Sequence, residues 1–400
     1  MRSRQQYIIT KGEVHGYASH WLGSALQFEY EGTKCTTSTL LQVLLLAASR
    51  MVSIFAACRD LADAPTDQTI RNALAATLPE IAELERRLNR SLATDLPKAL
   101  FRKSRRVAID LVLIPYHGQP LHDEKEIYRS QPKSGTSHFH AYATAAVVHK
   151  GHRYTLALTR VEYGEKMKDV VQRLLVIVRQ RGVKVRFLLL DKGFFSVEVI
   201  SYLKRAQLAF IIPAIVRGRK PKGRQKATGL RALRKKNNGY YRHTLNGKVG
   251  DKQRSTRVTI CVASKSYQHK KTGKRRCKKL LYVVWKVRLT PRDIRETYRK
   301  RFGIETSYRQ MHEARIKTCT RDPRLRLLFV GIALVLRNVW VWLHFKLDKG
   351  KWTDEPQLFL ELLRFREMLL WITQVVGRLL GADQHQGIDR ETYQRLTANT

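Results

Sequence analysis

The stretch RVAIDLVLIPYHG, residues 106–118, decides what kind of fold the chain can form. Its run of Val, Ile and Leu is typical of a buried strand, yet Asp110 stands in the middle of it. An ionised carboxylate on a buried strand is costly unless it meets a cation or several hydrogen bonds. Asp110 is therefore a candidate site residue, although a single such aspartate can also be purely structural.

The segments that follow alternate between strand and helix patterns. Strand patterns occupy 138–161 (two strands around a turn at Lys150-Gly151), 183–191 and 208–215, and helix patterns occupy 166–182 and 196–206. This order predicts a mixed α/β sheet covered by helices. A second acid, Asp191, ends the strand VKVRFLLLD. Because sites in α/β sheets gather at the carboxyl ends of strands, Asp110 and Asp191 together favour a functional site.

The regions on either side of this sheet differ in character. Before it, Thr66 or Asp67 is expected to cap a short helix that buries Ile70, Ala73 and Leu74, in either a helix-turn-helix or an ordinary bundle. After it, residues 217–236 contain ten cations and no acid, which predicts a mobile, solvated loop that could neutralise phosphates. Strands are then expected in 240–245, 257–264 and 278–287, with a basic turn at 265–279 between the last two.

The overall charge points to a polyanionic partner. The chain has 76 Lys and Arg against 33 Asp and Glu, a net charge of +43, and nucleic acid is the commonest partner for such a field. The charge runs through the whole chain rather than along one amphipathic helix, which argues against a membrane surface. The apolar runs 40–58 and 325–345 contain charged residues and are expected to be buried helices. Five cysteines without a CxxC pair indicate reduced thiols.

A third acid lies in YRKRFGIETSYRQMHEARIK, residues 298–317. Taken as one helix, this segment places Tyr298, Arg301, Glu305, Tyr308 and His312 on one face, with Arg309 close by. The structural alternative is a solvated helix in which Glu305 pairs with a neighbouring arginine for a few tenths of a kcal/mol.

Phosphodiester cleavage gives the three acids a common purpose. Two Mg²⁺ ions roughly 4 Å apart can activate the attacking oxygen and neutralise charge on the phosphate. Magnesium prefers hard oxygen ligands, so a few convergent carboxylates suffice. The surrounding Arg, Lys and Tyr side chains would then hold the DNA backbone.

Four segments carry a resemblance to a known family. They are IDLVLIPYHG, KSGTSHFHAYATA, LLLDKGFFSVEVISYL and the stretch 298–342, and together they resemble DDE transposases of bacterial and archaeal insertion sequences. The chain looks closest to the insertion-sequence-four superfamily, in the group first described from halophilic archaea. The resemblance covers nearly the whole chain.

The resemblance implies an α/β fold with an RNase H-like mixed sheet flanked by helices. It implies a helical N-terminal DNA-binding domain (1–100), a catalytic core in two parts (101–214 and 291–345), a basic β-rich insertion (215–290) between them, and C-terminal helices (346–400). Within the insertion, Trp285 or Tyr240 could stack on a flipped base, although buried strand aromatics are commoner.

The resemblance also assigns site residues. Asp110, Asp191 and Glu305 would be the catalytic, metal-binding triad, holding two Mg²⁺ ions that Mn²⁺ can replace. The DNA-binding residues would be Tyr298, Arg301, Tyr308, Arg309, His312 and Lys317. The family signature has Lys at the position of His312, and Arg309 or Lys317 could take over its phosphate contact.

The activity implied is cut-and-paste transposition. A dimer would bind the terminal inverted repeats in double-stranded DNA, cut the element ends and join the freed 3′-hydroxyls to target DNA, in the cytoplasm of a prokaryote, associated with the nucleoid and not with a membrane. Two alternatives stay open: a metal-dependent nuclease or resolvase on the same fold, and a non-catalytic DNA-binding protein.

The charge makes a first prediction. If the chain neutralises six to ten phosphates, its affinity for DNA should fall by about 10³–10⁵ between roughly 50 and 200 mM salt, because each contact releases counterions. Fluorescence anisotropy with a labelled duplex measures this slope. A flat response would show that the basic segments do not touch DNA.

Overall fold

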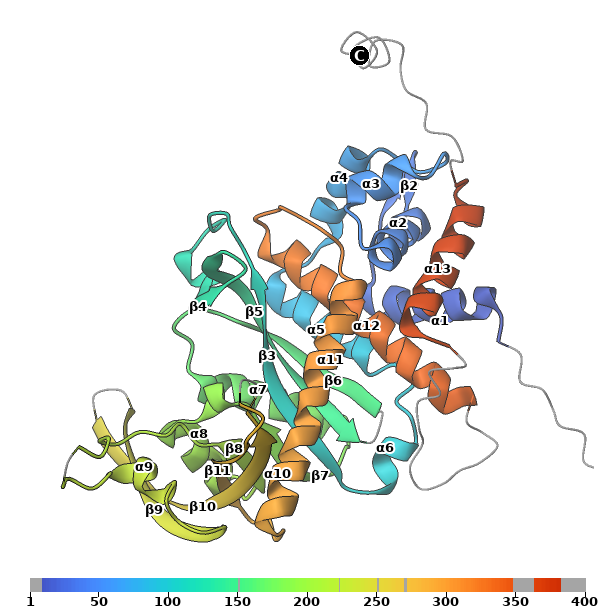
Figure 1. The fold of residues 1–400 in the computed structure, drawn as a ribbon. Helices are drawn as coiled ribbons and strands as arrows, with labels where there is room; N and C mark the ends of the chain where they lie inside the picture. The colour runs from blue at the N-terminus through green and yellow to red at the C-terminus, as the bar shows by residue number, and fades with distance from the viewer. Residues whose placement is uncertain are drawn as a thin grey trace, which may run out of the picture.

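A computed structural model describes residues 9–149, 152–222, 224–249, 252–269, 272–347 and 363–382, without the side chains of residues 149, 152, 249, 302–306 and 347. The expected mixed α/β sheet flanked by helices is confirmed (Figure 1). The expected turn at residues 150 and 151 and the chain after residue 382 lie outside the described residues.

The helices are α1 (Lys11–Leu26), α2 (Thr37–Arg50), α3 (Ile54–Arg59), α4 (Asp67–Thr77), α5 (Ile81–Leu92), α6 (Ala99–Arg102), α7 (Met167–Gln180), α8 (Val197–Arg205), α9 (Gly229–Leu233), α10 (Pro291–Arg299), α11 (Gly303–Glu313), α12 (Pro323–Leu347) and α13 (Phe365–Leu379), with 3₁₀ turns η1 (Glu124–Glu126), η2 (Lys192–Phe194) and η3 (Lys300–Phe302). The strands are β1 (Glu31–Gly32), β2 (Cys35–Thr36), β3 (Arg105–Pro115), β4 (Tyr128–Lys133), β5 (Thr136–His149), β6 (His152–Val161), β7 (Val185–Leu190), β8 (Phe210–Pro213), β9 (Gly239–Val249), β10 (Lys252–Gln268) and β11 (Arg275–Trp285).

The centre of the sheet is formed by the apolar runs of the sequence. β6, β5, β3, β7 and β8 lie side by side in that order. β3, β7 and β8 run parallel to one another, β5 runs antiparallel to β3, and β6 runs antiparallel to β5. Alternation along β3 sends Val107 and Ile109 to one face, which α7 and α8 cover, and Ala108 to the other face, which packs against α10. Asp110 shares the second face, because it follows Ala108 by two residues.

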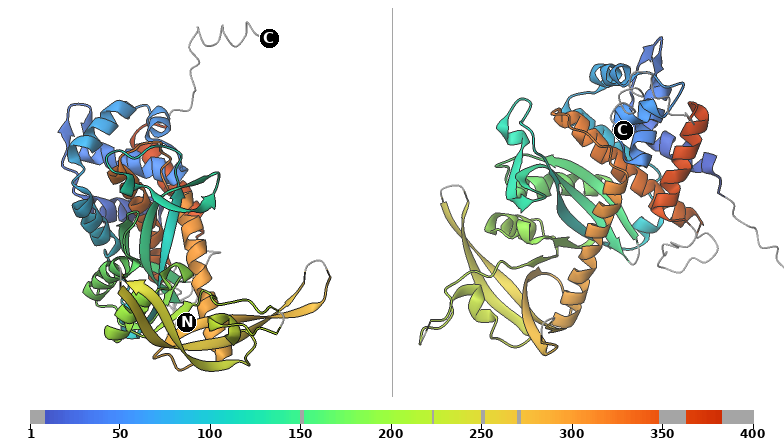
Figure 2. Two further views of the ribbon diagram at one scale, coloured as in Figure 1. Left: turned by 90° about the vertical axis from the view of Figure 1, so that its left-hand side faces the viewer. Right: turned by 45° about the horizontal axis from the view of Figure 1, so that its top comes forward.

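The basic insertion extends this sheet instead of forming a separate one. β11 pairs antiparallel with β8, and β10 and β9 follow outward. The expected strands are present, but the basic turn expected at 265–279 is wrong: Lys265–Gln268 belongs to β10 and Arg275–Lys279 to β11, where they form a protruding two-stranded ribbon (Figure 2). Long cationic side chains are tolerated there because both faces of the ribbon meet solvent.

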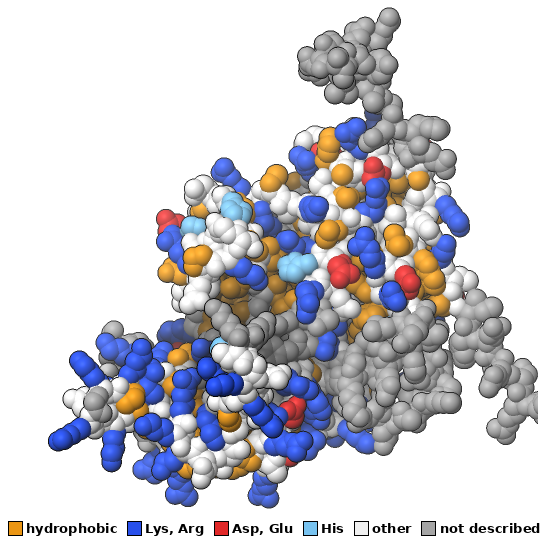
Figure 3. Space-filling view, in the orientation of Figure 1, with side chains coloured by type: hydrophobic (Ala, Val, Ile, Leu, Met, Phe, Trp, Pro, Cys, Tyr) orange, Lys and Arg blue, Asp and Glu red, His pale blue; other side chains and the backbone are white. Residues whose placement is uncertain are grey.

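The loop expected at 217–236 is partly ordered. It contains α9, whose Leu230 is buried, and the Arg231 side chain donates to the Gly218 carbonyl. Gly218, at φ +123°, lies so close to Thr228 that a Cβ there would clash with its carbonyl oxygen. Composition alone missed this order because one apolar residue anchors the segment. Lys and Arg side chains crowd this part of the surface, around α9 and β9–β11 (Figure 3).

The N-terminal and C-terminal helices form one layer beside the sheet. α1 and α2 pack against α13, and α5 packs against α12 (Figure 1). α12 is long and apolar enough to cross a membrane by composition, but 94% of its most apolar window is buried inside the protein. The run 325–345 is therefore a buried helix, as the sequence predicts. The run 40–58 is divided between α2, whose leucines are buried, and the short helix α3, whose Phe55 is 48% exposed.

The short helix α4 follows the sequence prediction closely. Thr66 is its N-cap and accepts a hydrogen bond from the Thr69 amide, and its buried residues are Ile70, Ala73 and Leu74. α3 precedes it across a short turn, so the order of elements fits a helix-turn-helix as well as a helical bundle.

Two asparagine side chains close the outer edge of β6. The side-chain oxygen of Asn338, on α12, accepts from the backbone N–H of Thr155 at 3.0 Å. Its side-chain nitrogen donates to the backbone carbonyl of Thr155 at 2.8 Å. Asn89 on α5 makes the same pair of bonds with Leu158, at 2.9 and 2.8 Å. Each side chain replaces a neighbouring strand, so buried backbone groups at the sheet edge stay paired.

This edge yields a stability prediction. Asn338→Ala should lower the free energy of unfolding by about 1–3 kcal/mol, because it leaves two buried backbone groups of Thr155 without partners. The control Asn72→Ala, on the exposed face of α4, should change it by less than about 0.5 kcal/mol. Urea denaturation followed by circular dichroism measures both, and equal effects would contradict this account.

Candidate active site

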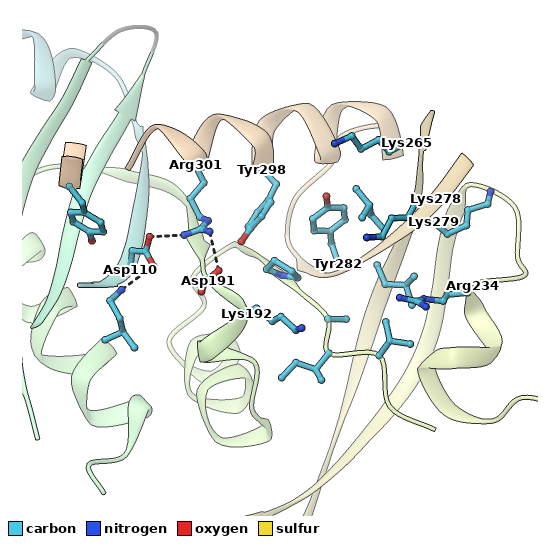
Figure 4. A pocket seen from close by; sticks show the side chains of 18 of the residues that line it. Asp110, Asp191, Lys192, Arg234, Lys265, Lys278, Lys279, Tyr282, Tyr298 and Arg301 are labelled. Carbon is cyan, nitrogen blue, oxygen red and sulfur yellow. Dashed lines mark hydrogen bonds and ion pairs between the residues drawn. The ribbon is translucent and has the colours of Figure 1, made fainter. Parts of the chain in front are cut away.

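A groove of about 1070 Å³ opens where the pairing of β3 with β7 ends, beside the middle of β3 and the carboxyl end of β7. The segment α10–η3–α11 forms one wall, and β8, β10 and β11 form the other (Figure 4). Among the residues whose side chains are described, the acids that line it are Asp110 and Asp191. Its cationic lining residues are Lys133, Lys192, Arg234, Lys265, Lys278, Lys279, Arg301 and Arg309.

Strand register brings the two aspartates together. Ile109 on β3 pairs with Leu190 on the parallel strand β7. The residues that follow them, Asp110 and Asp191, therefore lie beside each other. The side chain of Asp110 is only 11% exposed, whereas that of Asp191, just past its strand, is 40% exposed. The Leu111 amide donates to Asp110 Oδ1 at 2.9 Å.

Arg301 bridges the two carboxylates. From η3 its guanidinium donates through Nη1 to Asp110 Oδ2 at 2.8 Å and through Nη2 to Asp191 Oδ1 at 3.0 Å (Figure 4). Arg301 is 5% exposed. Burial lowers its pKa, but the charges of Asp110 and Asp191 and the adjacent Tyr298 outweigh burial, so the net pKa is raised and the side chain stays cationic.

Two tyrosines hold the wall against the sheet. Tyr298 on α10 donates to the Leu190 carbonyl at 3.3 Å, one residue before Asp191. Tyr308 on α11 and Thr144 on β5 share a hydrogen bond of 2.7 Å. Burial raises the pKa of both phenols, so both remain neutral. The tyrosines therefore act as hydrogen-bonding and packing groups at the base of the groove.

Comparison with known proteins identifies the family. Residues 102–338, more than half of the chain, match the model of the transposase DDE domain. The chain belongs to this family. The fold is also similar to the piggyBac transposase in a cryo-EM structure of its synaptic complex with hairpin DNA: TM-score 0.52, 13% identity, over 96% of this chain and 82% of that one. A search of the curated proteins found no match.

The structure gathers most of the predicted site residues of this transposase in the groove. Asp110, Asp191 and the predicted DNA-binding residues Tyr298, Arg301, Tyr308, Arg309 and His312 all line it. Lys317 is exposed but does not line it, and its backbone amide donates to the Val52 carbonyl at 3.0 Å. Glu305 lies on α11, between Arg301 and Tyr308, and its side chain lies outside the described residues.

The single helix expected over 298–317 is wrong. The chain makes α10, then the 3₁₀ turn η3, then α11, which ends at Glu313. Gly303, a weak helix former, begins the second helix, and the two helices are anchored in different hydrophobic clusters. Residues 298, 301, 308 and 312 still reach one groove, although not as one straight stripe.

Sequence reasoning missed the far wall of the groove. Lys265, Lys278 and Lys279 come from the ribbon, and Arg234 follows α9. Their basic segments were visible in the sequence, but not the pairing of β11 with β8 and of β10 with β11, which carries the ribbon toward the acids. The two aromatic residues named in the insertion differ: Tyr240 is 42% exposed and donates to the Leu289 carbonyl, whereas Trp285 is half-buried under Lys204.

The residues present fit a divalent ion in kind. DDE transposases generally use divalent metal ions, and carboxylate oxygens are the ligands Mg²⁺ and Mn²⁺ prefer. One guanidinium reaches both Asp110 and Asp191, so the two carboxylates are close enough to share a cation. Among the described residues no three His, Cys, Asp or Glu side chains form a metal cluster. A third ligand would come from outside them.

His312 gives a prediction about pH. Burial, with the nearby charges of Arg315 and Lys133, lowers its pKa from 6.5 to about 4, so it is neutral at pH 7. The unfolded state then binds the proton more tightly, and stability should fall as pH drops from about 6.5 toward 4, by up to about 1.4 kcal/mol per pH unit. His312→Gln should flatten this fall in urea denaturation repeated across the range. An unchanged pH profile would contradict the shift.

Proposed function

We propose that this transposase cuts DNA at the ends of a mobile element and joins them to target DNA, with Asp110, Asp191 and Glu305 as metal ligands. The observation that carries the proposal is the pair of aspartates held side by side at the mouth of a cationic groove. A pair of acids this close, with Asp110 buried, is unfavourable as simple packing because the two charges repel each other. It suits a site that must hold both metal ions and phosphates.

The cationic walls suggest how DNA would lie. Lys265 and Lys278 face one another across the ribbon, and Lys192 directly follows Asp191. Lys133 also lines the groove, and Arg309 lies on its α11 wall. The DNA backbone would therefore run from the ribbon toward Asp110 and Asp191. These contacts position DNA without reading its sequence.

The chain's own groups have separate roles in this scheme. Divalent ions bound to the carboxylates would activate the attacking water or 3′-hydroxyl and neutralise charge on the phosphate. Tyr298 and Tyr308, both neutral, fix the wall that carries Arg301 and Glu305. Arg309 and the lysines would hold the phosphates on either side of the cut. His312, neutral at pH 7, would supply packing or a hydrogen bond rather than the charge of the family's Lys.

The finer assignments are also proposals. Membership of the insertion-sequence-four superfamily, Mg²⁺ as the ion with Mn²⁺ as a substitute, and a dimer that binds two terminal inverted repeats all rest on the resemblance of the motifs. The same holds for a cytoplasmic, nucleoid-associated protein of a prokaryote. The exposed helices α3 and α4 and the basic ribbon are the surfaces available for binding the repeats.

Cleavage of the element's own DNA tests the proposal. Purified protein is incubated with DNA carrying its gene's flanking sequence, with Mg²⁺, Mn²⁺ or neither, and the products are mapped at nucleotide resolution. Metal-dependent cuts at a repeated flanking sequence are expected. Asp191→Asn and Glu305→Gln should lower the cleavage rate by more than about 100-fold, since even outer-shell partners of a metal cost 10–100-fold.

Controls separate a failed site from a failed protein. Asp169→Asn makes the same chemical change on α7, in a surface pair with Lys168, and should cut like the parent. Joining of a labelled 3′-end to target DNA distinguishes a transposase from a nuclease. DNA binding without cuts in any protein, under any metal, would instead indicate a non-catalytic DNA-binding protein.

A further inference from the structure

Arg301 occupies the oxygens that a metal ion would need. It takes Oδ2 of Asp110 and Oδ1 of Asp191, and the other oxygen of Asp110 accepts from the Leu111 amide. A divalent ion shared by the two aspartates therefore competes with the guanidinium for the place between the two carboxylates and for their negative charge. Arginine cannot lose its proton to make way, so it must move.

The backbone that carries Arg301 is a junction between two helices. Arg301 lies in η3, and a 3₁₀ segment inside a helix often marks a functional hinge. On one side, Ile294 and Tyr298 of α10 are fixed in the hydrophobic cluster beneath β10 and β11. On the other side, Met311 of α11 is fixed in the main core with α12. η3 lies between these two fixed points. A small change in its helical geometry would therefore move the Arg301 side chain away from the aspartates.

We propose that Arg301 is an internal counter-ion that competes with divalent metal ions for Asp110 and Asp191, and that a DNA phosphate in the groove draws it away. DNA binding and metal binding would then favour each other. This inference rests on the proposed function, because it assumes that the same carboxylates bind the metal.

Electrostatics supports the exchange. Without a cation, Asp110 and Asp191 would repel each other in a poorly solvated site, so Arg301 is needed when no other cation is near. With a divalent ion bound, a buried guanidinium at the same oxygens becomes a like charge and is unfavourable. A phosphate entering between Lys133 and Arg309 offers the guanidinium a bidentate partner of the geometry it prefers. The transposase would load metal mainly when DNA is present.

A permanent structural clamp predicts the opposite behaviour. If Arg301 only fastens η3 to the sheet, removing it would loosen both aspartates and weaken metal binding. If it is a competitor, removing it should strengthen metal binding in the absence of DNA. The two roles therefore differ in the sign of one measured affinity.

The test titrates Mn²⁺ into the full-length protein and follows free Mn²⁺ by EPR, with and without a short duplex carrying the gene's flanking sequence. In the parent protein the duplex should tighten Mn²⁺ binding by about 5–150-fold, the usual range for coupled sites. Arg301→Gln should bind Mn²⁺ about 10-fold more tightly than the parent without DNA. The duplex should then increase the Mn²⁺ affinity of this variant by a smaller factor than it increases that of the parent.

Arg309→Gln is the matched control. Arg309 lines the same groove and carries the same charge, but no ion pair joins it to either aspartate in the described part of the chain. Its replacement measures the general effect of removing one positive charge on Mn²⁺ binding. An increase in Mn²⁺ affinity equal to that of Arg301→Gln would overturn the proposal. Arg301→Lys keeps the positive charge but cannot donate to both carboxylates as a guanidinium does. Its Mn²⁺ affinity should lie between those of the parent and Arg301→Gln.

The outcomes separate this inference from the proposed function. Weaker Mn²⁺ binding in Arg301→Gln, with the parent unaffected by DNA, would overturn the exchange while metal-dependent cleavage still stood. No Mn²⁺ binding in the parent, with or without DNA, would overturn both. The comparison of the parent with and without DNA needs no variant, so it holds even if Arg301→Gln folds poorly, which circular dichroism would show.

Discussion

The bridge from Asp110 through Arg301 to Asp191 is the interaction on which the site depends. It joins a central strand, the end of its parallel neighbour and a 3₁₀ turn that is 191 residues from the first aspartate and 110 from the second. Two carboxylates this close require a positive partner, because burial strengthens their repulsion. The cation that pairs with them therefore also sets the position of the α10–η3–α11 wall relative to the sheet.

The rest of the fold fixes the two sides of that bridge. The parallel register of β3 and β7 sets the positions of the aspartates, and β3 keeps its place because β5 and β6 continue the sheet to an edge closed by Asn89 and Asn338. These asparagines come from the N-terminal and the C-terminal helices. The helical layer therefore belongs to the same cooperative structure as the catalytic sheet, whatever further role it has in binding DNA.

Local patterns in the sequence were enough to predict much of this. The apolar runs identified the central strands, an acid inside one run and an acid ending another identified Asp110 and Asp191, and the cap at Thr66 placed α4. Long-range pairing was not predictable. Composition indicated a turn at 265–279, but ten consecutive pairs between β10 and β11 hold that segment in a ribbon. Likewise, helical spacing could not show that separate anchors for Tyr298 and Met311 would break the helix between them.

The placement of an acid-bearing helix among cations follows from the demands of one phosphate. Among the described residues, eight Lys and Arg side chains line the groove; their field would attract DNA, but the same field repels a divalent ion. Only carboxylates set close together can overcome that repulsion locally, and they would in turn repel the phosphate unless neutralised. In the proposed function, the cationic groove and the acid pair therefore need each other: the acids would create a place for metal within a DNA-binding surface, and the bound cations would allow the phosphate to approach the acids.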